Sequence, residues 1–179
     1  MRKTFAALLT IFAAAASANE TVESSGYKLD VANSGGVKTI FTATSPVHEV
    51  PDATPRAVIE KAVACTSTIV TTRSQETPLF STQDPDSGLL VANIRVEYYA
   101  ALTQRVVQSR LTIEAREGRF RMTHSDMRNS VGSSPADLHL LTKIWGTSWE
   151  RSIKELSDTS EKIAACIKSS AEPKKAEDW

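Results

Sequence analysis

Residues Arg105–His124, which read RVVQSRLTIEAREGRFRMTH, carry the clearest strand-pairing pattern of the sequence. At its centre, Glu117-Gly118 has the composition of a two-residue hairpin turn. Pairing the chain outward from that turn sets apolar side chains opposite one another on one face and polar pairs on the other. The expected pairs are Ala115–Phe120, Ile113–Met122 and Leu111–His124 on the apolar face, and Glu114–Arg121 and Thr112–Thr123 on the polar face. A slip of one residue would mix the two faces, so the sequence predicts this register of two long antiparallel strands.

Further strands precede this hairpin. Apolar and polar side chains alternate along Leu89–Tyr99, which predicts a third long strand. The turn-rich run Asp84–Gly88 separates it from a short strand-like run at Leu79–Ser81. Val47–Val50 is a further short β-rich run. Together these segments predict a mostly antiparallel sheet.

Two amphipathic helices are expected to pack side by side on one face of this sheet. The first, Thr54–Ile69, opens with a Thr-Pro pair that suits an N-cap followed by the first helical turn. The second, Thr147–Ser170, opens with a capping box that Thr147 completes with Glu150. The fold class is therefore α+β: a twisted, mostly antiparallel sheet with two helices packed on one face.

The remaining segments are assigned from composition. Tyr27–Val31 and Val37–Thr44 flank the turn-like sequence Asn33-Ser34-Gly35-Gly36 and predict an N-terminal hairpin. Residues 19–26 and 125–134 are polar and are expected to be loops, while Ser134–Trp145 is expected to form a short helix and 171–179 a charged tail.

The chain begins with a pattern typical of a secretory signal peptide. Met1-Arg2-Lys3 is followed by the apolar run Phe5–Ala16 and by the small residues Ala16-Ser17-Ala18. The apolar run is shorter than the roughly 20 residues that a membrane span needs. We therefore expect a soluble product in the periplasm or outside the cell. The expected organisation is a signal peptide at 1–18, an N-terminal extension at 19–45, one α+β domain at 46–170 and the tail at 171–179.

Charge argues against a nucleic-acid partner. The whole chain has 21 basic and 21 acidic residues, and removal of Arg2 and Lys3 leaves 19 against 21, a net charge of −2. Nucleic-acid and anionic-membrane binders usually carry a basic excess. We expect no nucleic acid and no integral membrane segment, and the oligomeric state stays open.

Two cysteines, Cys65 and Cys166, are present. Their separation fits no zinc or CxxC pattern. In an oxidising compartment an even pair is most simply a disulfide, although two separate buried thiols are the alternative. The side-by-side arrangement of the two helices would bring these cysteines close together.

Part of the chain resembles an uncharacterised bacterial exported-domain family, a domain of unknown function with a TATA-binding-protein-like fold. The matching pieces are His48-Glu49-Val50-Pro51 before the Thr54–Ile69 helix, the Asp86-Ser87-Gly88 turn, and Glu117-Gly118-Arg119-Phe120-Arg121-Met122-Thr123 in the hairpin. The resemblance covers roughly residues 46–126. It departs at Thr66-Ser67, where the family has an aromatic residue. The resemblance implies a fold and no activity, so it assigns no catalytic residue.

No catalytic residue, metal site or cofactor is predicted from side-chain patterns. His48, His124 and His139 have neither HxxxH nor HExxH spacing, and no GxSxG elbow or phosphate loop occurs. A hydrolase that uses a serine with His124 or His139 stays open as an alternative. A carrier of an apolar ligand, held in a cavity lined by Ile94, Ile113 and Met122, is another alternative.

The leading hypothesis is a non-catalytic binding or assembly module that uses the open sheet face. Alternation places a set of polar side chains on the face away from the helices. The candidate binding residues are Asn93, Arg95, Gln108, Arg110 and Arg121. Glu97 and Glu114 lie among the arginines, which is also typical of a solvated sheet face with cross-strand pairs. The expected partner is an envelope protein, a peptide or a glycan.

Overall fold

The computed structural model describes residues 19–34, 36–70, 78–100, 102–130, 137–144 and 148–169. The expected signal peptide at 1–18 and tail at 171–179 lie outside these ranges, as does Thr147 of the expected capping box. No helix within the described ranges is both long and apolar enough to cross a membrane.

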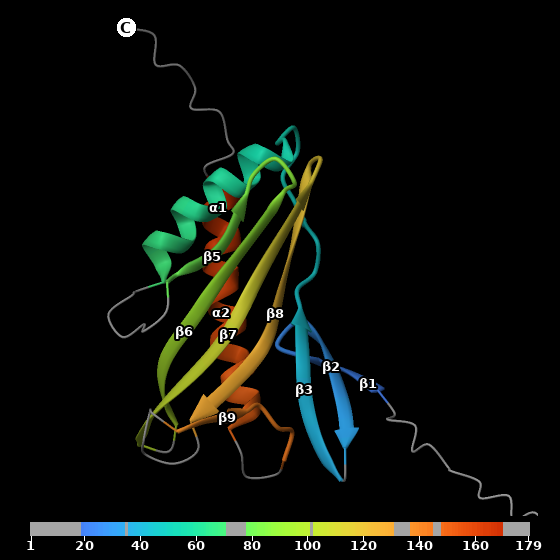
Figure 1. Ribbon diagram of the computed structural model, residues 1–179, viewed down its shortest axis with the longest axis vertical. Helices are drawn as coiled ribbons and strands as arrows, with labels where there is room; N and C mark the ends of the chain where they lie inside the picture. The colour runs from blue at the N-terminus through green and yellow to red at the C-terminus, as the bar shows by residue number, and fades with distance from the viewer. Residues whose placement is uncertain are drawn as a thin grey trace, which may run out of the picture.

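Strands within the described ranges form one antiparallel sheet of nine members (Figure 1). Its order is β1-β2-β3-β8-β7-β6-β5, and β4 and β9 each pair with β8 outside this path. The strands are β1 (Asn19–Ser24), β2 (Tyr27–Ser34), β3 (Val37–Thr44), β4 (His48–Glu49), β5 (Phe80–Asp84), β6 (Leu89–Ala100), β7 (Thr103–Arg116), β8 (Arg119–Ser130) and β9 (Leu138–Leu140).

The β7–β8 hairpin has the register that the sequence predicts. Leu111 lies opposite His124, Ile113 opposite Met122 and Ala115 opposite Phe120, and the polar pairs Thr112–Thr123 and Glu114–Arg121 are also formed. Gly118 has a φ of +66°, which glycine adopts without the steric cost of a Cβ atom. The predicted N-terminal hairpin is confirmed as well, because β2 pairs antiparallel with β3.

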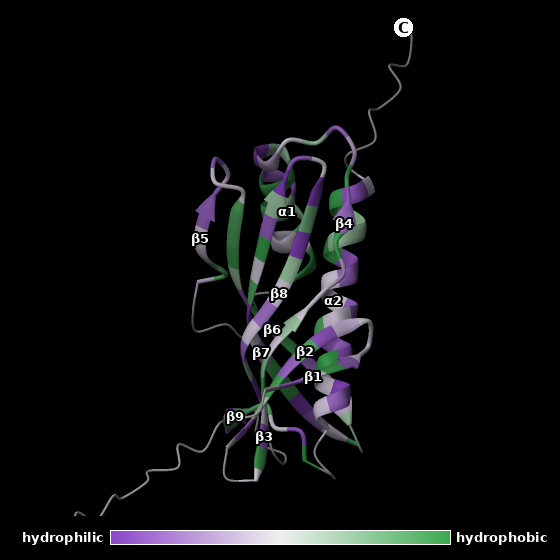
Figure 2. Ribbon diagram, turned by 90° about the vertical axis from the view of Figure 1, so that its right-hand side faces the viewer, coloured by the Kyte–Doolittle hydropathy of each residue, from purple (hydrophilic) through white to green (hydrophobic). Residues whose placement is uncertain are grey.

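Two helices, α1 (Pro55–Ile69) and α2 (Trp149–Ser169), pack on the same face of the sheet. Both lie behind the strands in Figure 1, and the quarter turn in Figure 2 separates the sheet from α2. The Thr54 hydroxyl caps α1 by accepting a hydrogen bond from the Ala57 amide at 3.3 Å. We call the helix-covered face the inner face and the opposite one the outer face. The predicted α+β class is confirmed.

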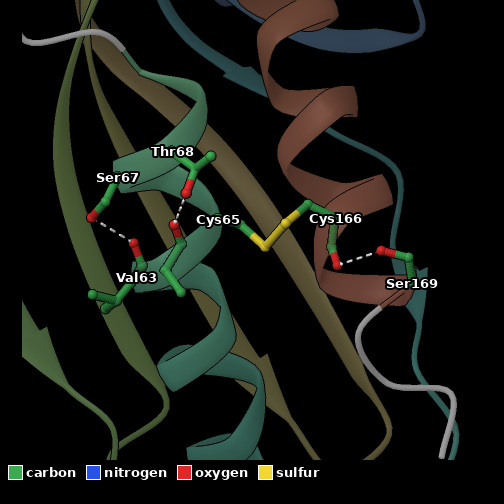
Figure 3. Close-up of a disulfide and its surroundings, with 7 residues drawn as sticks. Val63, Cys65, Ser67, Thr68, Cys166 and Ser169 are labelled. Atoms are coloured by element: carbon green, nitrogen blue, oxygen red, sulfur yellow. Dashed lines mark hydrogen bonds between the residues drawn. A yellow bond between two sulfur atoms is a disulfide. The ribbon is translucent and has the colours of Figure 1, made fainter. Parts of the chain in front are cut away.

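A disulfide joins the two helices (Figure 3). Cys65 on α1 and Cys166 on α2 are bonded, and their Cα atoms lie 5.9 Å apart. The pairing favoured from the sequence over two separate thiols is thus formed. Between the helices and the sheet lies an apolar core whose largest fully buried side chains include Ile59, Leu111, Phe120, Met122 and Ile153.

Three loop and helix assignments from the sequence are wrong. Residues 19–24 form the edge strand β1, because their backbone pairs with β2 and Val22 packs against the core. Strand β8 continues beyond residue 125 to Ser130, and the positive φ of Asp126 (49°) accommodates an irregularity in its pairing with β7.

The expected short helix at Ser134–Trp145 is also not formed where the structure describes it. Residues Leu138–Leu140 are strand β9, which lies between β8 and one end of β3. The Leu141 amide donates to the Met127 carbonyl, and the Leu141 carbonyl accepts from the Ile40 amide, both at 2.9 Å. In extended conformation this segment can hydrogen-bond the backbone N–H and C=O groups of two diverging strands at once. A helix would pair its backbone groups only within itself.

Candidate functional site

The five candidate binding residues share the outer face but do not form one cluster. Strand pairing sets Asn93 directly opposite Arg110 and Arg95 opposite Gln108 on β6 and β7. Arg121 lies on β8 opposite Glu114, four strand positions from the residue that pairs with Arg110. That interval corresponds to about 13 Å along a strand.

Four of these residues differ in their contacts and exposure. The Arg121 guanidinium lies 2.8 Å from the Glu114 carboxylate, and Arg110 lies 3.5 Å from Asp126, both as exposed ion pairs. Arg95 has only 18% of its side chain exposed. The Asn93 side-chain amide donates a hydrogen bond to the Pro78 carbonyl at 2.8 Å, which anchors the segment before β5. The exposed ion pairs of Arg110 and Arg121 contribute little to the stability of the fold.

An open polar depression of about 360 Å³ lies where the N-terminal hairpin meets β8. Seven side chains line it, all of them polar: Asp30, Thr42, Thr44, Thr112, Glu114, Arg121 and Thr123. Only Arg121 belongs to the candidate set. Asp30, Thr42 and Thr44 were missed because the sequence predicts the hairpin but gives no sign that β3 pairs with β8.

A smaller depression of about 150 Å³ adjoins the first and shares Glu114 and Arg121 with it. Its other lining residues are Val47, Arg116, Arg119 and Phe120. Arg116 and Arg119 face each other directly across the β7–β8 hairpin. Two guanidinium groups in opposed positions make this end of the outer face locally basic, and they also repel each other.

An exposed apolar array lies at the other end of the outer face. The isolated bridge between Thr39 and Thr142 sets Val37 opposite Ile144 and Phe41 opposite Leu140 in the same antiparallel register. The four apolar side chains are 42%, 45%, 54% and 53% exposed, respectively. We call Val37, Phe41, Leu140 and Ile144 the outer apolar array.

His124 lies on the inner face and is fully buried. Its Nδ1 is 2.8 Å from the Ser109 hydroxyl and its Nε2 is 2.8 Å from the Ser160 hydroxyl of α2. Burial lowers the pKa of His124 to about 4. The neighbouring Tyr27 ring lies 6.0 Å away, and burial raises the pKa of Tyr27 to about 12.

The other two histidines lie elsewhere. The ring of His48 stacks on Phe120 with 4.9 Å between centroids, and burial, followed by the charge of Lys168, lowers its pKa. His139 is exposed on β9. Within the described ranges, no group of three or more His, Cys, Asp or Glu side chains is arranged to hold a metal ion.

The three residues named for the alternative carrier cavity lie in the core between sheet and helices. Ile94, Ile113 and Met122 are at most 1% exposed and belong to the same packed cluster. None of the three lines either of the two depressions described above.

Comparison with solved structures identifies the fold. A DUF4468 family protein from Bacteroides ovatus superposes with a TM-score of 0.55 at 11% identity, covering 76% of this chain and 90% of that chain. A TBP-like protein from Parabacteroides distasonis gives a TM-score of 0.51 at 11% identity, covering 78% and 95%. No family model and no curated protein matches the sequence. The TBP-like fold implied by the resemblance is thus confirmed, and at this identity the likeness extends to the fold alone.

Proposed function

We propose that the protein is an exported, non-catalytic binding or assembly module that contacts its partner through the outer face of the sheet. Residues 1–18 would direct the chain to the periplasm or outside the cell and be removed. The Cys65–Cys166 disulfide supports this location, because disulfides persist chiefly in oxidising compartments. The partner would be an envelope protein, a peptide or a glycan.

The outer apolar array is the observation that carries the proposal. Its four side chains form two cross-strand pairs, one on each side of the Thr39–Thr142 bridge, on a face that neither α1 nor α2 covers. Single exposed apolar residues are ordinary on protein surfaces, but apolar residues gathered in one patch mark interaction sites. The polar depression and the exposed Arg110 and Arg121 ion pairs give the same face a polar margin.

The hydrolase alternative receives no support from His124. A serine nucleophile needs a histidine that substrate can reach and, in most such sites, an acid that orients it. His124 contacts two serine hydroxyls, yet it is fully buried, and no carboxylate is among its hydrogen-bond partners. Its low pKa reflects the cost of charging a buried imidazole rather than activation.

The proposal is tested by capture from cell-envelope extract of the cells that make the protein. Phe41 and Leu140, the most exposed cross-strand pair of the outer apolar array, are replaced together by glutamate, which puts two charges into the array. Leu102, which is fully exposed in the turn between β6 and β7, is replaced by glutamate as the matched control. We expect the wild type and Leu102→Glu to retain the same partner, and the double variant to lose it.

Thermal unfolding of the three proteins must agree to within a few degrees, so that loss of binding is not loss of fold. Equal retention by all three proteins would place the binding surface elsewhere and overturn the proposal.

A further inference from the structure

The polar depression is built from rows of side chains that run across neighbouring strands. Thr44 on β3 lies opposite Thr123 on β8, and Thr123 lies opposite Thr112 on β7. Neighbouring strands are about 4.8 Å apart, so three hydroxyl-bearing side chains are spaced evenly along one line. The next row sets Thr42 opposite Ser125.

The hydroxyls of the first row have no partner among the described residues. The side-chain hydroxyls of Thr44, Thr112 and Thr123 make no hydrogen bond to another described residue, although each residue is only partly exposed. A hydroxyl can donate one hydrogen bond and accept two. The row therefore presents donors and acceptors together, in a fixed geometry, at the floor of the depression.

Charged groups at the margin of the depression are held in place. The Thr42 hydroxyl donates to the Asp30 carboxylate at 2.6 Å, and Arg121 pairs with Glu114 at 2.8 Å. Two carboxylates and one guanidinium give the lining a net charge of −1. An anionic ligand would meet both carboxylates, and an apolar ligand would find no apolar lining.

An exposed aromatic ring stands beside the depression. Residues Ile40 and Ala43 of β3 are buried, and the two residues between them both face outward where the β2–β3 register shifts. One of these is Thr42, which lines the depression, and the other is Phe41, which is more than half exposed. The electron-rich face of an aromatic ring packs well against polarised C–H groups.

We propose that the depression binds a neutral saccharide unit of a glycan. Sugar hydroxyls can donate hydrogen bonds to the carboxylates, accept them from the guanidinium group, and do both with the threonine hydroxyls. The C–H face of the sugar ring can pack against the ring of Phe41. The volume of about 360 Å³ lies within the usual range for small-ligand sites. This inference rests on the proposed function and gives its outer face a ligand class.

The test is affinity electrophoresis of protein purified from cells that express the full-length chain. Native gels contain laminarin, dextran or galactomannan as neutral polysaccharides, or polygalacturonate as an acidic one. We expect at least one neutral polysaccharide to retard the wild type and polygalacturonate not to retard it. The double variant Thr112→Val, Thr123→Val, which keeps side-chain shape, is expected to bind at least tenfold more weakly.

Thr82→Val, an exposed threonine on the edge strand β5, is the matched control and should bind as the wild type does. Should the double variant lose its native circular dichroism spectrum, Asp30→Asn replaces it, with the same tenfold loss expected. Retardation by none of the neutral polysaccharides, or unchanged binding by the variant, overturns the saccharide assignment. Partner capture that still depends on Phe41 and Leu140 would then leave the outer-face function standing with a different ligand class.

Discussion

His124 is completely buried, yet each of its ring nitrogens lies 2.8 Å from a serine hydroxyl. Hydrogen bonding from both sides removes the cost of an unpaired buried donor or acceptor, which is typically about 1–3 kcal/mol. Charging the ring in this environment is unfavourable, which lowers the pKa to about 4. His124 therefore acts as a neutral link between β8 and Ser160 of α2.

A dependence of stability on pH follows from this lowered pKa. The folded state keeps His124 neutral, whereas the unfolded state takes up a proton below its ordinary pKa of 6.5. The contribution of His124 to stability is thus complete above pH 6.5 and is lost as pH falls to about 4. The shift corresponds to about 3 kcal/mol in the free energy of unfolding.

Urea unfolding at pH 7 and pH 4.5 measures this loss of stability. In His124→Gln, the free energy of unfolding should change less between these two pH values than in the wild type. NMR titration of the His124 ring gives a direct check. A ring that titrates near pH 6.5 in the folded protein would contradict the prediction.

At the scale of elements, α2 is attached to the rest of the domain by polar bonds as well as by apolar packing. Ser152 bonds to Tyr98 at 2.8 Å, Ser157 donates to the carbonyl of Ser25 at 3.0 Å, and Ser160 bonds to His124. At its far end the helix is joined to α1 through the disulfide. These bonds fix the position of α2 on the inner face along its length, and the disulfide couples α1 to it.

Reduction of the Cys65–Cys166 disulfide should lower the melting temperature. The bond closes a loop with a sequence separation of 101. In the chain-entropy model, closing such a loop lowers the entropy of the unfolded state and thereby raises the free energy of unfolding by at most about 4–5 kcal/mol. The native protein should show no thiol reactive with Ellman's reagent, and Cys65→Ser with Cys166→Ser should melt like the reduced protein. Two readily labelled thiols in native, unreduced protein would contradict this expectation.

The elements that the sequence predicts well are those with a strong pattern of their own. The β7–β8 register follows from which residues can share a face, and α1 follows from its cap and its apolar stripe. Strands β1 and β9 carry no such pattern, because they exist through backbone bonds to strands that are distant in sequence. Local sequence reasoning therefore assigns them to loops or helix.

On the scale of the whole molecule, the sheet separates two environments. The inner face supports the core and both helices, and the outer face combines the apolar array, the polar depression and the basic hairpin end. The candidate residues were placed on the outer face by strand alternation alone. The array and the side of the depression formed by β2 and β3 were missed, because they form only when β3 meets β8 and β9. A functional surface made by non-local pairing leaves little trace in a single sequence.

The most direct test of the outer face as the proposed binding surface is site-specific photocrosslinking in the cells that make the protein. A photoreactive phenylalanine derivative is placed at Phe41 or Leu140 on the outer face, and at Ala64 on α1 or Lys162 on α2 as exposed helix controls. We predict covalent adducts from the two outer-face positions and none from the helix positions. Adducts formed only from α1 or α2, or from none of the four positions, would contradict the account.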